Sequence, residues 1–165
     1  MNIKGYKMDG LGNDFLILDQ RSDPINLNKD QIKHLANRNN IGFDQLITIN
    51  IEKNSIPKIL FFNSDGGRIS ACGNGSRCVS YFLMQEKKIN EISIDTVDRI
   101  LHCTIAESKS VKINMGKPIF DWKKIPLARE EDINNIKIKI NEYGEFKGSV
   151  LSVGNPHVIF FQEIE

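Results

Sequence analysis

One segment of the sequence is long enough to form a buried helix, and the segments around it are strand-sized. From near Asn74 to about Lys87 the apolar residues recur at helical positions i, i+1, i+4 and i+5, namely Cys78, Val79, Phe82 and Leu83. This stripe is broad enough for a central helix with strands packed around it. The pattern therefore favours an α/β (α+β) fold built on one helix.

Short runs rich in Ile, Val and Phe predict the strands. They lie at residues 3–8, 15–19, 45–50, 58–63, 92–97, 100–106, 111–115 and 158–161. Alternating Ile and Lys at 136–140, followed by turn residues at 142–145, predicts a hairpin. A second, shorter helix is expected from an N-cap at Asn28 to about Arg38, with one apolar face formed by Ile32, Leu35 and Ala36.

The first break in composition is Gly116-Lys117-Pro118. We therefore predict a first domain at residues 1–116 and the start of a second, incomplete domain at 117–165. The apolar run 158–161 lies close to the last residue, Glu165, with no helical segment to cover it. An unfinished second domain is expected.

Composition and charge exclude several classes of protein. The net charge is +1, and its 22 basic residues are scattered among 21 acidic ones, so no nucleic-acid-binding surface is indicated. The N-terminus lacks a signal peptide and no apolar segment is long enough to cross a membrane, which favours a cytoplasmic protein. The three cysteines are not accompanied by the second Cys or His pair of a zinc motif, so we predict no metal.

The run Cys72-Gly73-Asn74-Gly75 places a thiol at a glycine-rich helix start. Gly73 and Gly75 permit close approach by a ligand, and the amides there attract an anion such as a carboxylate. The same field lowers the pKa of a thiol, to a range of roughly 3.5 to 7.5. Such a thiolate could remove the proton α to a bound carboxylate. The alternative is that Cys72 is a small buried residue in a turn.

Four side-chain amides add to this run: Asn13 in Gly-Asn-Asp-Phe, Gln45 in Phe-Asp-Gln, Asn63, and Asn155 in Gly-Asn-Pro-His. Each alone is typical of a turn or cap. In this order, with a step of nine residues from Asn63 to Cys72, they resemble the diaminopimelate epimerase family. The similarity covers nearly the whole chain.

The resemblance implies two similar halves, each a β-barrel-type sheet wrapped around a central helix, with the active site between the two helix starts. It implies epimerisation of LL-diaminopimelate to the meso form, without a cofactor, in lysine and peptidoglycan-precursor synthesis. Carried over by position, Cys72 is a catalytic acid/base and His157 adjusts the thiol pKa. Substrate would be bound by Asn13, Gln45, Asn63, Gly73, Asn74 and Asn155. We expect the four side-chain amides to converge near Cys72.

The sequence departs from the family pattern in two places. Residues 67–71 replace the usual serine-and-acid stretch, and the second helix start with its partner thiol is absent. Inversion at carbon needs a second base, so this polypeptide, expected to be truncated, is predicted to be inactive or impaired alone. The implied partners are the substrate and either a second copy or a complementing second half.

Two other interpretations stay open from the sequence. One is a non-catalytic remnant, or a half-module that binds an amino-acid carboxylate. The other is an isomerase of the phenazine-biosynthesis type, a group that does not use a cysteine at this position. Cys72 argues against the latter.

Overall fold

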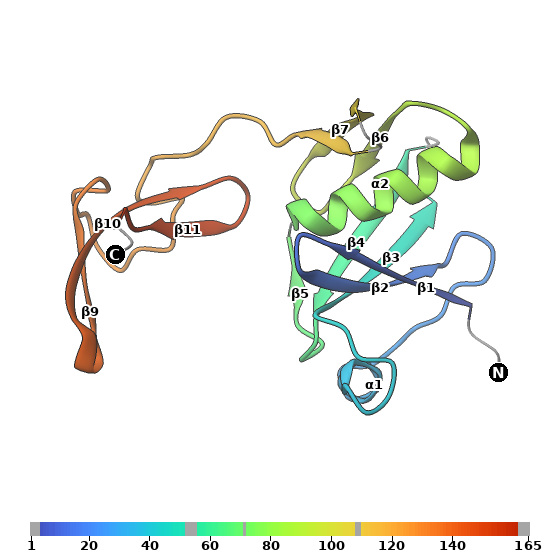
Figure 1. The fold of residues 1–165 in the computed structure, drawn as a ribbon, viewed down its shortest axis with the longest axis horizontal. Coiled ribbons are helices and arrows are strands. Elements are labelled where there is room, and N and C mark those ends of the chain that lie inside the picture. Colours follow the sequence, from blue (N-terminus) through green and yellow to red (C-terminus); the bar gives the residue numbers. More distant parts are fainter. Residues whose placement is uncertain (1–3, 52–55, 71, 108–109, 162–165) are drawn as a thin grey trace. The chain divides into compact units, whose positions relative to one another are not determined.

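The computed structural model describes residues 4–51, 56–70, 72–107 and 110–161. The chain folds into two compact units, unit 1 at Met1–Asn114 and unit 2 at Met115–Glu165 (Figure 1). The boundary predicted from the sequence, between residues 116 and 117, lies two residues beyond this division.

Unit 1 alternates strands with two helices. Its elements are β1 (Gly5–Gly10), β2 (Asn13–Asp19), α1 (Lys29–Ala36), β3 (Gln45–Ile51), β4 (Pro57–Asn63), β5 (Arg68–Ile69), α2 (Gly73–Lys87), β6 (Glu91–Asp95), β7 (Ile100–Ile105) and β8 (Val111–Asn114). Unit 2 contains β9 (Ile136–Ile140), the 3-10 turn η2 (Asn141–Tyr143), β10 (Gly144–Ser152) and β11 (Pro156–Ile159). Residue 3, where the first strand was predicted to begin, lies outside the described residues.

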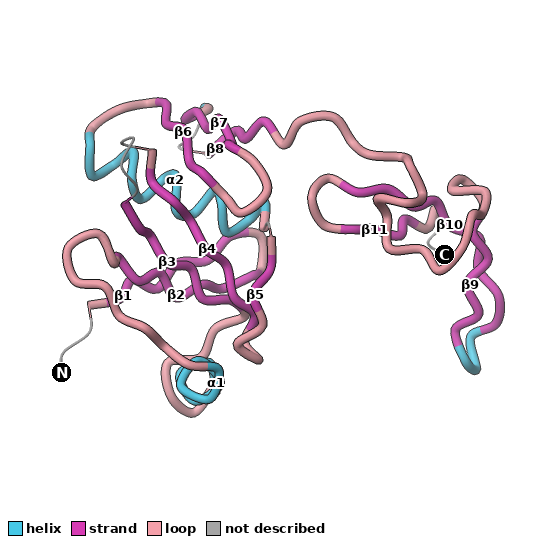
Figure 2. Tube along the Cα trace, turned by 180° about the vertical axis from the view of Figure 1, so that it is seen from behind, coloured by secondary structure: helices cyan, strands magenta, loops and turns pink. Residues whose placement is uncertain are grey.

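The sheet of unit 1 surrounds α2. Within the described residues it has eight strands in the order β1-β2-β3-β4-β6-β7-β8, with β5 paired to β4. Helix α2 contacts β1, β2 and β3 as well as β6, β7 and β8, so both edges of the sheet reach the same helix (Figures 1 and 2). This confirms the predicted fold class, a sheet wrapped around a central helix.

The middle strands are buried on both faces. Phe15, Ile17 and Ile47 are fully buried, as expected for residues between a sheet and a helix. The opposite face of β2 and β3 packs on α1 through a second cluster, Leu16, Leu18, Ile32, Ala36, Phe43 and Leu46. Because β2 is covered on both sides, residues 15–18 form a continuous apolar run, whereas Thr48 and Asn50 interrupt the apolar residues of β3.

Both helices begin where the sequence predicts. Helix α2 starts after the N-cap Cys72, and α1 starts after Asn28, whose side chain forms a capping box with Gln31. Helix α1 ends at Ala36, two residues before the predicted end. The returning chain is the cause, because the amides of Gly42 and Phe43 bond to the carbonyls of Leu35 and Ala36.

Strands β1 and β2 are joined by a two-residue loop. Gly10 pairs with Asn13, and the intervening Leu11 and Gly12 have φ values of +53° and +88°. Positive φ at both loop positions is the geometry of the tight hairpin turns that suit twisted strands. The loop therefore fixes Asn13 directly at the start of β2.

Unit 2 is a three-stranded antiparallel sheet in the order β11-β10-β9, with a small core of Ile125, Ile136 and Val150. The hairpin predicted at 136–145 is confirmed, with Ile140 paired to Gly144. The last strand was predicted at 158–161 but lies at Pro156–Ile159. Its start is set by the tight loop at 153–155, where the amide of Val153 bonds to the carbonyl of Asn155 and Ser152 pairs with Pro156.

The two glycines at the start of α2 differ in their surroundings, and this gives a test of the packing. A Cβ on Gly75 would lie 3.0 Å from Ile47 Cδ1 and 3.1 Å from Phe61 Cε1, whereas one on Gly73 would meet nothing within 4 Å. We expect Gly75→Ala to lower the free energy of unfolding by about 1–2 kcal/mol, because overpacking outweighs the gain in helix propensity. Urea unfolding followed by far-UV circular dichroism measures this.

Gly73→Ala is the matched control, since it makes the same change two residues away in open space. It should leave stability unchanged or raise it slightly. Equal losses in the two variants would contradict the packing role of Gly75.

Candidate active site

Three of the predicted site amides lie at one end of the sheet. Asn13 is the first residue of β2, and Gln45 is the first residue of the parallel strand β3. Asn63 is the last residue of β4 and pairs with Gln45, whose Nε2 donates to Asn63 Oδ1 at 3.3 Å. The parallel pair β2–β3 and the antiparallel pair β3–β4 thus bring all three residues to the same end of the sheet.

The start of α2 lies over this end of the sheet. Gly75 packs against Ile47 and Phe61, which are two residues along their strands from Gln45 and Asn63. Residues two apart on a strand share a face. Gln45 and Asn63 therefore lie on the face of the sheet that carries the helix start.

Cys72 is held by the first turn of this helix. It has extended backbone angles, and its Sγ accepts a hydrogen bond from the amide of Gly75 at 3.3 Å. Its carbonyl accepts from the amide of Ser76 at 2.8 Å. The thiol is half-buried, whereas Cys78 and Cys103 are buried. Cys72 is the most accessible of the three thiols.

The predicted lowering of the Cys72 pKa is wrong for this structure. Burial raises the pKa of the Cys72 thiol more than the hydrogen bonds from the amides of Gly75 and Asn74 and the charge of Arg77 lower it. The sequence shows the helix start but not the depth at which the thiol lies. Burial also raises the pKa of Cys78, to about 11, and the pKa of Cys103.

Asn74 links the helix start to the sheet. Its Nδ2 donates to Asn13 Oδ1 at 3.0 Å, and its Oδ1 accepts from Arg77 Nη1 at 2.6 Å. Gly73 next to it faces open space. The two glycines of the motif therefore act differently: Gly73 leaves room for a ligand, and Gly75 allows the helix to pack on the sheet.

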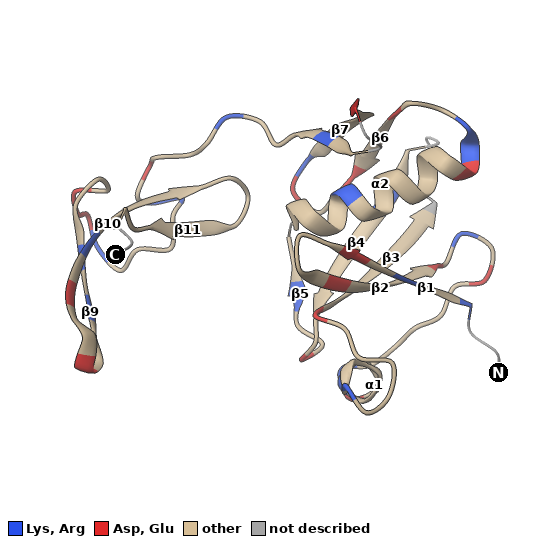
Figure 3. Ribbon diagram, in the orientation of Figure 1, with Lys and Arg blue, Asp and Glu red and all other residues tan. Residues whose placement is uncertain are grey.

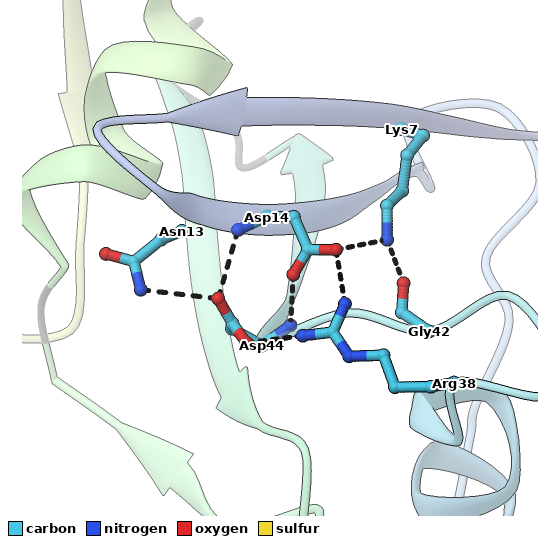
Figure 4. A network of polar contacts seen from close by, with 6 residues as sticks. All are labelled: Lys7, Asn13, Asp14, Arg38, Gly42 and Asp44. Carbon is cyan, nitrogen blue, oxygen red and sulfur yellow. Dashed lines mark hydrogen bonds and ion pairs between the residues drawn. The ribbon is translucent and has the colours of Figure 1, made fainter.

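An ionic network beside Asn13 was not predicted from the sequence (Figure 4). Arg38 bonds to Asp14 at 2.5 Å and to Asp44 at 2.6 Å, and the amides of the two acids each bond to the other's carboxylate, at 3.1 and 2.9 Å. Lys7 pairs with Asp14 at 2.7 Å and also donates to the carbonyl of Gly42. The signal available was an acid next to each of two site amides, at Asn13-Asp14 and Asp44-Gln45.

The other two predicted site residues belong to unit 2. Asn155 lies in the loop between β10 and β11, and His157 is an exposed residue of β11 paired with Leu151. Their convergence with Cys72 stays a prediction, as do the roles of all the site residues.

Neither a metal site nor a membrane span is found in the part of the chain that the structure describes. No group of three His, Cys, Asp or Glu side chains there could hold a metal ion. No helix there has the length and apolar character that crossing a membrane requires. Basic and acidic residues are interspersed along the elements of each unit (Figure 3).

Solved structures share this fold. A hydroxyproline epimerase from Agrobacterium vitis superimposes with a TM-score of 0.64 at 10% identity, covering 96% of this chain and 51% of that one. A phenazine biosynthesis protein of the PhzF family from Bacillus anthracis gives a TM-score of 0.58 at 18% identity, covering 97% and 56%. These likenesses concern the fold alone. The class of fold that they define is a sheet enclosing one helix, and in this chain that helix begins at the thiol of Cys72.

Within that class, the chain belongs to the diaminopimelate epimerase family, whose model matches residues 5–120. The diaminopimelate epimerase of Pelagibacter ubique (strain HTCC1062) is 45% identical over 164 residues, which are 98% of this chain and 60% of the relative. That of Phenylobacterium zucineum (strain HLK1) is 37% identical over 94% of this chain and 57% of the relative. The chain thus spans less than two thirds of the length of these relatives.

Cys72 should be the thiol that iodoacetamide alkylates first in the native protein, because it is the least buried of the three. Since its pKa lies above the ordinary value, we expect its alkylation rate to rise about tenfold from pH 7 to pH 8. Peptide mapping by mass spectrometry after timed quenching measures both. Earlier labelling of Cys78 or Cys103 would contradict the accessibility of Cys72.

Acid stability should depend on Asp14. Arg38 and Lys7 hold the pKa of Asp14 well below its usual range, so this carboxylate stabilises the fold above its unfolded pKa of about 3.9, and the stabilisation is lost as the pH falls toward the folded pKa. We expect Asp14→Asn to be less stable than wild type at pH 7 and to lose less further stability between pH 5 and pH 3. Urea midpoints across that range test this.

Asp23→Asn serves as the control, because Asp23 is an exposed carboxylate in the same unit and outside this network. The urea midpoint of this variant should fall between pH 5 and pH 3 by as much as that of the wild type. If the urea midpoint of Asp14→Asn fell with pH as steeply as that of the wild type, other carboxylates would be responsible for the loss of stability in acid.

Proposed function

We propose that this chain supplies one acid/base thiol and part of the substrate site of a diaminopimelate epimerase, which converts LL-diaminopimelate to the meso form. The observation that carries the proposal is the half-buried Cys72 at the start of α2, with Asn74 and Asn13 bonded together beside it. Membership of the family supports the substrate and the reaction.

The proposed chemistry starts with the α-carboxylate of the substrate at the helix start. The amides there, with Gly73 leaving open space, would hold the carboxylate and stabilise charge that develops on its oxygens. Cys72 as thiolate removes the α-proton and becomes the thiol. Its raised pKa makes the thiol a weaker acid and its thiolate a stronger base toward carbon.

Inversion requires a proton to arrive on the face opposite to the one it left. A single fixed thiol returns the proton only to its own face, so a second acid/base is needed. We place this second group outside residues 1–165 of the same molecule: on a longer chain, on a complementing half or on a second copy. The reaction needs no cofactor in this scheme, because both proton transfers use protein side chains.

The remaining site assignments are part of the proposal. Asn13, Gln45 and Asn63, at one end of the sheet, offer amide groups to the polar ends of the substrate. Asn155 would contribute a fourth amide and His157 would adjust the thiol pKa. We also place the protein in the cytoplasm, a compartment that keeps thiols reduced, because all three cysteines are free.

Isotope exchange tests the proposal. Residues 1–165 incubated with LL-diaminopimelate in heavy water should incorporate deuterium at the α-carbon slowly and form little meso product, because an open half-site leaves the carbanion in contact with water. Adding a separately expressed C-terminal segment of a relative should raise meso formation. Mass spectrometry and chiral chromatography follow the two products.

Cys72→Ser should abolish the exchange, whereas Cys103→Ala, which removes a buried thiol from β7, should not. Exchange that persists in Cys72→Ser would remove Cys72 from the mechanism. Rapid meso formation by the chain alone would mean that it contains the second acid, with His157 the first candidate. Binding of diaminopimelate without any exchange would favour the binding half-module instead.

A further inference from the structure

We propose that Arg77 is a positioning residue of this site: a chain of side-chain hydrogen bonds anchored on Asp44 holds its guanidinium where it stabilises the thiolate of Cys72. The inference rests on the proposed acid/base role of Cys72 and adds a residue to it.

The chain of hydrogen bonds runs in one direction, from a cation to an anion. Arg77 Nη1 donates to Asn74 Oδ1 at 2.6 Å, and Asn74 Nδ2 donates to Asn13 Oδ1 at 3.0 Å. Asn13 Nδ2 then donates to Asp44 Oδ2 at 3.3 Å. Asp44 is itself fixed by Arg38, at 2.6 Å.

This arrangement determines how both amides are oriented. Turning the amide of Asn74 would place its NH₂ group against the guanidinium of Arg77, and turning that of Asn13 would place its oxygen against the carboxylate of Asp44. Each bond in such a head-to-tail chain polarises the next. The position of the Arg77 head is therefore coupled to the sheet end through Asn13.

Core packing does not account for Arg77. It is the fifth residue of α2, whose first turn contains no acidic residue that could pair with it. Arg77 is also exposed, so it does not contribute to the core. Its bond to Asn74, three residues earlier, keeps a long flexible side chain beside the site.

Charge balance around the thiol favours the same role. The charge of Arg77 lowers the pKa of Cys72 and of Cys78, against the effect of burial. Asp9 on β1 acts in the other direction on Cys78. On the side of β2 and β3, Asp14 and Asp44 are paired with Arg38. Among the residues that the structure describes, Arg77 is thus a cation whose charge lowers the pKa of Cys72.

The test is the pH profile of Cys72 alkylation by iodoacetamide in the 165-residue chain, from pH 6.5 to 10, with peptide mapping. We expect Arg77→Gln to raise the apparent pKa of Cys72 by about 0.5, which lowers the thiolate fraction about threefold near pH 7.5. Arg77→Lys keeps the charge without the forked head and should recover part of the shift.

Two further variants separate position from charge. Asn13→Ala removes no charge, yet it breaks the chain of bonds and should raise the apparent pKa of Cys72 in the same direction by a smaller amount. Lys87→Gln removes a cation at the far end of the same helix, about 22 Å from Cys72 along the helix axis, and should leave the profile unchanged. Far-UV circular dichroism confirms that each variant is folded before its profile is recorded.

A wild-type profile in Arg77→Gln would overturn the proposal, as would equal shifts in Arg77→Gln and Lys87→Gln. A wild-type profile in Asn13→Ala would overturn the anchoring through Asp44. Because the assay reads the thiol and not epimerisation, these results are independent of deuterium exchange. If the chain showed no deuterium exchange but Arg77→Gln shifted the alkylation profile as expected, the result would contradict the proposed function and not the role of Arg77.

Discussion

The contact on which unit 1 depends is the close approach of the first turn of α2 to β3 and β4. Gly75 has no side chain to separate the helix from Ile47 and Phe61, so the helix start lies directly on the sheet. That approach places Cys72 above the strand ends that carry Gln45 and Asn63. It also removes the thiol partly from water, which explains why burial is the largest influence on its pKa. Packing and reactivity at this site have one cause.

Most elements of unit 1 could be predicted from the sequence, because they have local signals; the two-residue strand β5 was not predicted. Helix α2 was indicated by its apolar period and α1 by the cap at Asn28. The acids Asp14 and Asp44 stand next to predicted site amides, but nothing local shows that they meet, since they are thirty positions apart and the parallel pairing of β2 and β3 brings them together. The pKa of Cys72 was missed because burial depends on tertiary packing, and β11 was misplaced because a loop sets its register.

In the candidate site, too, the sequence predicted the residues but not the contacts between them. The motif residues near Cys72 were found from their order along the chain, whereas their mutual hydrogen bonds were not. Asn74 was expected to bind substrate, and its side chain makes contacts that were not predicted, which join the helix to Asn13 and to Arg77. A side-chain amide can donate one hydrogen bond and accept another at the same time. A series of amides can therefore fix one another's orientation across a site, which apolar or charged side chains cannot do.

The loop between β1 and β2 limits which sequence changes the surface next to Asn13 can accept during evolution. Its two residues both have positive φ, and Leu11 adopts this conformation without the freedom of glycine while remaining 82% exposed. One residue more or less would shift the pairing of β1 against β2, because the two-residue loop sets Gly10 opposite Asn13. Most surface loops tolerate insertions and deletions, but we expect this loop to keep its length. Only the identity of the residue at its tip can then vary.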